Sequence, residues 1–166
     1  MAISGTNLFN IDTGILQKDA CIIIVRTEWN AAIVDELEKG CLHILSQYGF
    51  TNYKVINVPG AFEIPFAVKS FWDNTALEKP HAFIVLGCVL RGDTPHFDYV
   101  CKAVTDGIVQ LNLTLPVPTI FGVLTVDNDQ QAQDRVGGVH GHKGEEAAVT
   151  ALKMIALQHS FYKKVK

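Results

Sequence analysis

Residues 82–99 read A-F-I-V-L-G-C-V-L-R-G-D-T-P-H-F-D-Y, an apolar run that breaks into a polar turn. The run lacks the alternation of a half-buried strand, so it predicts a strand at 83–90 that is covered on both faces. Thr94 is suited to cap the next helix, because Pro95 lacks an N–H group and fits a first helical position. Backbone N–H groups behind such a cap attract anions, and His96 follows directly. The turn therefore predicts phosphate binding beside a proton-transfer group, with an ordinary helix start and a surface histidine as the alternative.

Along the rest of the chain, segments with a strand pattern alternate with segments with a helix pattern. Further strands are predicted at 21–25, 53–58 and 119–126, and helices at 30–49, 62–71, 95–113 and 145–161. Asp127 and Gln130 resemble a capping box for a short extra helix, and the glycine-rich segment 137–144 predicts a turn. Strands that alternate with helices predict an α/β fold with a parallel sheet, helices on both faces and right-handed crossovers.

Length and composition narrow the class of protein. A chain of 166 residues suits a single domain, which we place at 1–166 with an N-terminal arm at 1–19. Hydrophobic residues make up 48% against 19% charged, which is rich for a monomer and predicts subunit contacts. The net charge of −3 and the scattered basic residues predict no nucleic-acid partner. No apolar stretch reaches the roughly 18 residues of a membrane span, so no membrane partner is expected.

The cysteines and the first residues predict a cytoplasmic protein. The four cysteines form no C-x-x-C pair and two of them lie in apolar runs, as reduced, buried thiols do. The N-terminus has no basic region followed by an apolar one, so it does not resemble an export signal. His140 and His142 form an H-x-H pair with no cysteine or carboxylate at ligand spacing, and we expect no metal there.

Each segment with chemical character follows a predicted strand, and together these segments resemble the lumazine synthase family. The matching blocks are R-T-E-W-N (26–30), V-P-G-A-F-E-I-P (58–65), G-C-V-L-R-G-D-T-P-H-F-D-Y-V-C (87–101), P-T-I-F-G-V-L-T (118–125), Q-A-Q-D-R-V-G (131–137) and H-K-G-E-E-A-A (142–148). The resemblance implies a flavodoxin-like, three-layer domain with a four-stranded parallel sheet. It also allows an extra N-terminal strand from a neighbouring subunit.

The family resemblance implies an enzyme of riboflavin biosynthesis. The reaction condenses 5-amino-6-(D-ribitylamino)uracil with 3,4-dihydroxy-2-butanone 4-phosphate to 6,7-dimethyl-8-ribityllumazine, releasing phosphate and water. No cofactor is implied. The family assembles as homo-oligomers with active sites shared between adjacent subunits, either pentamers or pentamers joined in an icosahedral shell. The compact segment 136–143 favours the shell.

Carried over residue by residue, the resemblance assigns substrate binding to Trp29, Ala61, Phe62, Glu63, Cys88, Val89, Leu90 and Phe121. Trp29 would stack on the heterocycle, Glu63 would accept ribityl hydroxyls, and residues 88–90 would contact the pyrimidine edge through their backbone. Phe121 would come from the neighbouring subunit. Plain packing of Trp29 beneath the first helix and of Phe121 in the core remain open alternatives.

The same resemblance assigns phosphate binding to Asp93, Thr94, Arg135 and Lys143, and catalysis to His96. Asp93 would contribute its backbone N–H, and the two-pronged guanidinium of Arg135 suits a phosphate. His96 has a side chain suited to moving protons in both directions near neutral pH. Solvated surface cations are the alternative for Arg135 and Lys143.

Two other functions remain open. A flavin-binding or flavin-storage module would use Trp29 in the same way but has no use for a phosphate seat. A purely structural shell protein would assemble without activity. A phosphoryl-receiver domain is excluded. It needs clustered acids after the first strand and an acceptor aspartate after the third, where this chain has Arg26-Thr27 and Arg91-Gly92.

Overall fold

The computed structural model describes residues 9–11, 19–76 and 79–163. Its sheet has four strands: β1 (Ile22–Thr27), β2 (Tyr53–Val58), β3 (Ala82–Leu90) and β4 (Thr119–Val126). The strands lie in the order β2-β1-β3-β4, and every pair is parallel. The predicted α/β class and its four strands are confirmed. Apart from 9–11 and 19, the expected N-terminal arm and its extra strand lie outside the described residues.

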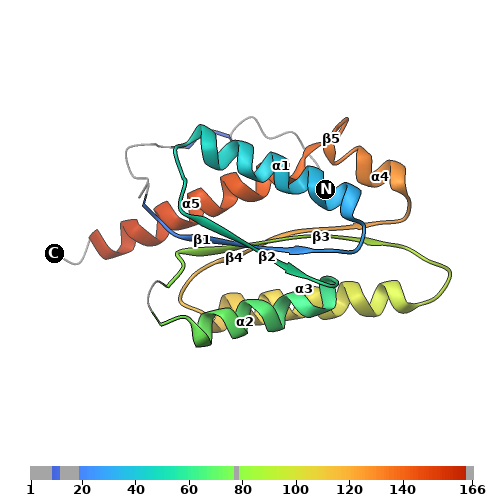
Figure 1. The fold of residues 1–166 in the computed structure, drawn as a ribbon, viewed down its shortest axis with the longest axis horizontal. Helices are drawn as coiled ribbons and strands as arrows, with labels where there is room; N and C mark the ends of the chain where they lie inside the picture. The colour runs from blue at the N-terminus through green and yellow to red at the C-terminus, as the bar shows by residue number, and fades with distance from the viewer. Residues whose placement is uncertain (1–8, 12–18, 77–78, 164–166) are drawn as a thin grey trace.

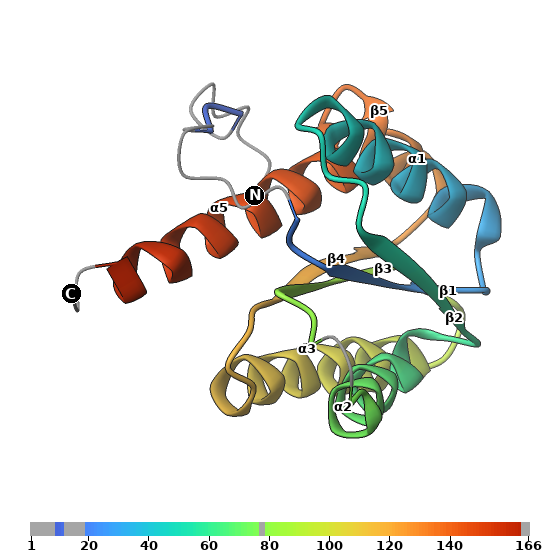
Figure 2. The ribbon, with the colours of Figure 1, turned by 60° about the vertical axis from the view of Figure 1, so that its left-hand side comes forward.

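Helices cover both faces of the sheet in three layers (Figure 1). One face carries α1 (Ala31–Gln47), α4 (Asp129–Gln133) and α5 (Lys143–Lys163), and the other carries α2 (Ile64–Asn74) and α3 (His96–Thr114). A 3₁₀ turn, Ala61–Glu63, precedes α2. An antiparallel hairpin, β5 (Val136–Gly138) and β6 (Gly141–His142), precedes α5. Figure 2 shows the sheet between the two helical layers.

Alternating side chains of each central strand enter two separate cores. Ile22 and Ile24 pack with α1 and α5, whereas Ile23 and Val25 pack with α2 and α3. Full burial of one such side chain stabilises the fold by roughly 1.5–3 kcal/mol. Because both faces are covered, the strands have the unbroken apolar sequences from which they were predicted. No helix within the described ranges is long and apolar enough to cross a membrane.

Two predicted helix caps are wrong. Pro95, with φ −62°, occupies the N-cap position of α3 in place of Thr94, and no side chain caps the helix. The Pro95 carbonyl already accepts from the Asp98 N–H at 3.0 Å, so the helical bonding begins there. The short helix α4 is capped by Asn128, one residue after the predicted Asp127. Asn128 has extended backbone, from which its side chain accepts the N–H of Gln131 at 2.9 Å.

Candidate functional site

The loop after β1 places Trp29 at the carboxyl end of the sheet. The N–H of Glu28 donates to the Val58 carbonyl at 2.9 Å, and the N–H of Trp29 to the Pro59 carbonyl at 3.2 Å. A Cβ added to Gly60 would lie 2.7 Å from the Cε3 and Cζ3 atoms of the indole. The ring therefore lies against bare backbone on one side, yet it is 64% exposed. It is not buried beneath α1, and it leaves area free for a planar ligand.

Glu63 lies beside this ring in the 3₁₀ turn. Its Oε2 would be 3.2 Å from a Cβ on Gly60, the same position that the indole approaches. This oxygen is buried and has no hydrogen-bond partner among the described residues. An unsatisfied buried acceptor costs about 1–3 kcal/mol and is suited to a ligand hydroxyl. Of its neighbours, Ala61 is buried and Phe62 is 60% exposed.

The end of β3 has one side free of strand pairing. Pairing with β1 stops where Leu86 lies opposite Arg26, whereas residues 87–90 pair with β4 alone within the described part of the chain. The side-chain amide of Asn30 donates to the Cys88 carbonyl at 2.8 Å on this free side. Asn30 has left-handed backbone, φ 57° and ψ 41°. It occupies the N-cap position of α1, but its side chain makes no hydrogen bond that caps the helix.

Burial raises the pKa of the Cys88 thiol to about 11, with a smaller contribution from the charge of Asp129. A thiol with such a raised pKa is a poor nucleophile at neutral pH. A ligand would therefore contact Cys88 through its backbone groups rather than through a reactive thiol, and Val89 in the same way.

The turn after β3 presents Asp93, Thr94 and His96 at the surface. Within the part of the chain that the structure describes, their side chains form no hydrogen bond or ion pair. All three are free to meet a ligand at the start of α3, where the helix dipole favours an anion.

Arg91, which sequence reasoning did not assign to the site, fixes this turn. Its Nε donates to Asp127 Oδ1 at 2.7 Å, and its Nη1 to Asp98 Oδ1 at 3.3 Å. The guanidinium lies 4.0 Å from the ring centroid of Phe97. These contacts join the end of β3 to the loop after β4 and lower the pKa of Asp127, chiefly through the Arg91 hydrogen bond. The sequence does carry a signal for this contact: a basic residue follows one predicted strand and acidic residues follow the next strand.

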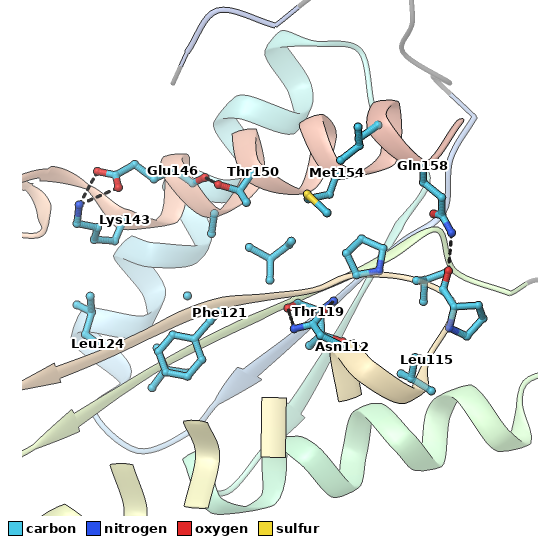
Figure 3. Close-up of a pocket in the computed structure, with 18 of the residues that line it drawn as sticks. Asn112, Leu115, Thr119, Phe121, Leu124, Lys143, Glu146, Thr150, Met154 and Gln158 are labelled. Atoms are coloured by element: carbon cyan, nitrogen blue, oxygen red, sulfur yellow. Dashed lines mark hydrogen bonds and ion pairs between the residues drawn. The ribbon is translucent and has the colours of Figure 1, made fainter. Parts of the chain in front are cut away.

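Phe121 and Lys143 lie elsewhere, in a groove of about 810 Å³ along the open edge of β4 (Figure 3). Phe121 is 42% exposed, which excludes simple core packing in this chain. The Lys143 Nζ donates to both carboxylate oxygens of Glu146 at 2.7 Å. The groove is otherwise largely apolar, with α3 and α5 as its walls.

Arg135 lies between α4 and the hairpin. Its Nη1 donates to the Gln131 carbonyl at 2.8 Å, and its own carbonyl accepts the N–H of Lys143 at 2.8 Å. Among the described residues no carboxylate forms an ion pair with it, so its guanidinium keeps donors for a ligand.

The structure thus divides the predicted residues into two groups. Around the ends of β1, β2 and β3 lie Trp29, Ala61, Phe62, Glu63, Cys88, Val89, Leu90, Asp93, Thr94 and His96. Phe121, Lys143 and Arg135 belong to the edge of β4 and the hairpin. None of the first group lines the groove that holds Phe121 and Lys143. Over the described ranges, no three His, Cys, Asp or Glu side chains gather to hold a metal.

Comparison with known proteins gives a consistent result. The family model described as 6,7-dimethyl-8-ribityllumazine synthase matches residues 19–159. The protein of that name from Parabacteroides distasonis is 52% identical over 134 residues, which is 80% of this chain and 82% of the relative. Its namesake from Porphyromonas gingivalis is 49% identical over 143 residues, 85% and 87% of the two chains. A third, from Christiangramia forsetii, is 39% identical across 98% of this chain and 99% of its own. Because the match covers most of both partners at this identity, the chain belongs to the 6,7-dimethyl-8-ribityllumazine synthase family.

Proposed function

We propose that this chain condenses 5-amino-6-(D-ribitylamino)uracil with 3,4-dihydroxy-2-butanone 4-phosphate to 6,7-dimethyl-8-ribityllumazine, releasing phosphate and water. The reaction is the penultimate step of riboflavin biosynthesis. Family membership supports it. The observation that carries it in this chain is the exposed indole of Trp29 at the end of a parallel sheet. Beside it lies the buried Glu63 oxygen, which has no hydrogen-bond partner among the described residues.

The first group of residues binds the aminopyrimidine in this proposal. Trp29 stacks on the heterocycle with the face that Gly60 leaves uncovered, and Glu63 accepts hydrogen bonds from the ribityl hydroxyls. Phe62 and Ala61 line the same turn. Residues 88–90 contact the pyrimidine edge through backbone groups, because none of the described strands pairs with that side of β3 beyond Leu86. The Cys88 carbonyl has a second lone pair besides the one that Asn30 uses.

The phosphorylated substrate lies at the start of α3. Backbone N–H groups at Asp93 and Thr94 face its phosphate, helped by the helix dipole. Arg135 supplies a two-pronged donor and Lys143 a point charge. His96 accepts a proton during condensation and returns it as phosphate leaves. Holding the amine and the ketone together supplies much of the acceleration, since forming an imine chiefly needs orientation.

The active site is shared between adjacent subunits of a homo-oligomer. Phe121 and Lys143 lie apart from the strand-end group in one chain, which suits residues that complete a neighbour's site. Arg135 accompanies Lys143, because the backbone bond between them links their positions. The apolar groove along β4 offers surface for the contact. The assembly is a pentamer, and pentamers join into an icosahedral shell.

The domain comprises residues 1–166 with an arm at 1–19, and it acts in the cytoplasm. None of the four cysteines forms a disulfide and three are buried, which suits a reducing compartment.

The decisive experiment is a steady-state assay of lumazine fluorescence with both substrates, with each substrate omitted in turn as control. Stoichiometric release of inorganic phosphate is measured in parallel. Absence of product from an intact oligomer would reject the proposal. Tight riboflavin binding would then indicate a flavin-binding module, and its absence a purely structural shell protein.

Sharing of the site is tested with mixed oligomers. Trp29→Ala and Arg135→Ala each remove one half of the proposed site. Refolding the two impaired variants together restores some sites with wild-type KM values if the halves come from different chains. Mixed particles of normal size in which no sites regain wild-type KM values would mean that one chain holds the complete site.

A further inference from the structure

The hairpin before α5 connects the two cations proposed for phosphate. Arg135 directly precedes β5, and Lys143 directly follows β6. The N–H of Lys143 donates to the Arg135 carbonyl at 2.8 Å, and His140 N–H donates to the Asp134 carbonyl at 2.8 Å. The base of the hairpin is therefore closed, and both cations move with it as one unit.

The hairpin is seated on α1 by the imidazole of His142. Gly40 of α1 faces this ring, and a Cβ at Gly40 would lie 2.5 Å from Nδ1 and 2.6 Å from Nε2. Both distances are far below van der Waals contact, so only glycine leaves room for the ring. The Nδ1 atom is buried and has no hydrogen-bond partner within the described residues. The ring is therefore held by shape rather than by polar bonds.

A second close contact lies next to the first. A Cβ at Gly144 would lie 2.8 Å from the carbonyl carbon of Leu37, so α5 begins directly against the backbone of α1. Leu37 and Gly40 are three residues apart and share one face of α1. The segment that carries Lys143 is thus fixed from both sides, by His142 before it and Gly144 after it.

We infer that His142 is a positioning residue for the phosphorylated substrate, an inference that rests on the proposed function. The imidazole occupies the space above Gly40 and sets how far the hairpin lies from α1. That distance determines where Arg135 and Lys143 present their charges. The two histidines of the H-x-H pair therefore have different roles, since His140 is exposed whereas His142 is packed against α1.

The test is a double-mutant cycle on Gly40 and His142. His142→Ala removes the ring and raises KM for the phosphorylated substrate roughly fivefold or more, the scale expected for residues in direct contact. It leaves KM for the aminopyrimidine and kcat nearly unchanged, which a general loss of folding would not. Gly40→Ala displaces the ring and has a similar effect. In the double variant, the methyl added at position 40 occupies the space that the imidazole has left. Gly40→Ala therefore raises KM for the phosphorylated substrate less in the His142→Ala background than in the wild type.

His140→Ala is the matched control, because it lies two residues away on the same hairpin and is exposed. A KM change in His142→Ala no larger than in this control would overturn the inference, as would fully additive effects in the double variant. If Gly40→Ala does not assemble, His142→Ala and His142→Asn carry the test, since both shorten the side chain without a clash.

Binding of inorganic phosphate, measured by calorimetry, separates this inference from the proposed function. Wild-type protein that makes no lumazine but binds phosphate more tightly than His142→Ala would reject the function and support the positioning role. Equal phosphate affinities, or no phosphate binding by the wild type, would overturn the positioning role even where lumazine is formed.

Discussion

The side-chain amide of Asn30 donates to the carbonyl oxygen of Cys88 at 2.8 Å and joins the ends of two neighbouring strands beyond their last paired residues. The bond depends on the left-handed backbone of Asn30, φ 57°, which turns the amide towards β3. Asparagine adopts this backbone more readily than other non-glycine residues. The loop that carries Trp29 is thereby fixed to the strand that carries residues 88–90.

Replacing Asn30 separates the contributions of the backbone and the hydrogen bond. Asn30→Ala strains the backbone and removes the bond, and we expect the free energy of unfolding to fall by about 2 kcal/mol. Asn30→Gly removes only the bond and costs about 1 kcal/mol. Denaturant unfolding measures both. Equal losses in the two variants would show that the left-handed conformation is not a source of strain.

Gly60 is predicted to control the indole of Trp29. Gly60→Ala places a methyl 2.7 Å from two ring atoms, so the ring must move. The backbone at Gly60, φ −146° and ψ 179°, suits alanine, so the substitution leaves the backbone unstrained and acts on the indole, with a looser contact to the Glu63 carboxylate at 3.2 Å. We expect KM for the aminopyrimidine to rise about tenfold, the scale of a lost stacking contact of roughly 1–3 kcal/mol.

Gly92→Ala is the control for this substitution, because a Cβ there meets nothing within 4 Å. Steady-state kinetics with the aminopyrimidine varied compares the two alanines. A KM for Gly60→Ala that equals that of Gly92→Ala would mean that the position of the indole does not govern binding.

The Arg91–Asp127 pair predicts a loss of stability in acid. The Arg91 hydrogen bond lowers the pKa of Asp127 from its ordinary value of 3.8. A carboxylate whose pKa is lower in the folded state stabilises the fold above 3.8, and this contribution is lost as pH falls through the folded value. Asp127→Asn should therefore have a lower melting temperature than the wild type at pH 7. The difference in melting temperature should disappear once the pH falls below the folded-state pKa of Asp127. A difference that persists unchanged in acid would contradict the pairing.

The fold was predictable because its local signals agree, whereas the contacts that complete the site are not local. The run at 82–90 is apolar without alternation, and burial on both faces is the physical reason. Asn30 occupies the N-cap position of α1, yet its side-chain amide donates to Cys88, a partner that no local pattern indicates. The packing of His142 on Gly40 also joins distant segments.

The division of the candidate site could not be predicted from local sequence either. Trp29 and Phe121 were both assigned to substrate binding, and only the family resemblance placed Phe121 in a neighbouring subunit. Within one chain they lie on different surfaces, which neither segment's own sequence indicates. Pro95 replaced Thr94 at the cap because the carbonyl of Pro95 already begins the helical bonding, a difference of one residue that residue preferences do not resolve.

Glu146 is predicted to compete with phosphate for Lys143. Both Glu146 oxygens accept from the Lys143 Nζ at 2.7 Å. Glu146→Gln removes the competing charge and should lower KM for the phosphorylated substrate about threefold, the scale of one partly exposed ion pair. Asp73→Asn, which breaks the Lys69 pair on α2, is the control and should leave KM unchanged. A higher KM in Glu146→Gln would mean that the carboxylate orients Lys143 instead of competing for it.

His96 is predicted to assist the reaction without being indispensable. Its side chain is exposed at the start of α3, next to the proposed phosphate seat, where it can move a proton but is not needed to hold the amine and ketone together. His96→Ala should lower kcat by about a hundredfold, the low end of general acid–base contributions, with both KM values little changed. His43→Ala, an exposed histidine on α1, is the control. Complete loss of turnover with intact assembly would mean that proton transfer, and not juxtaposition, supplies most of the acceleration.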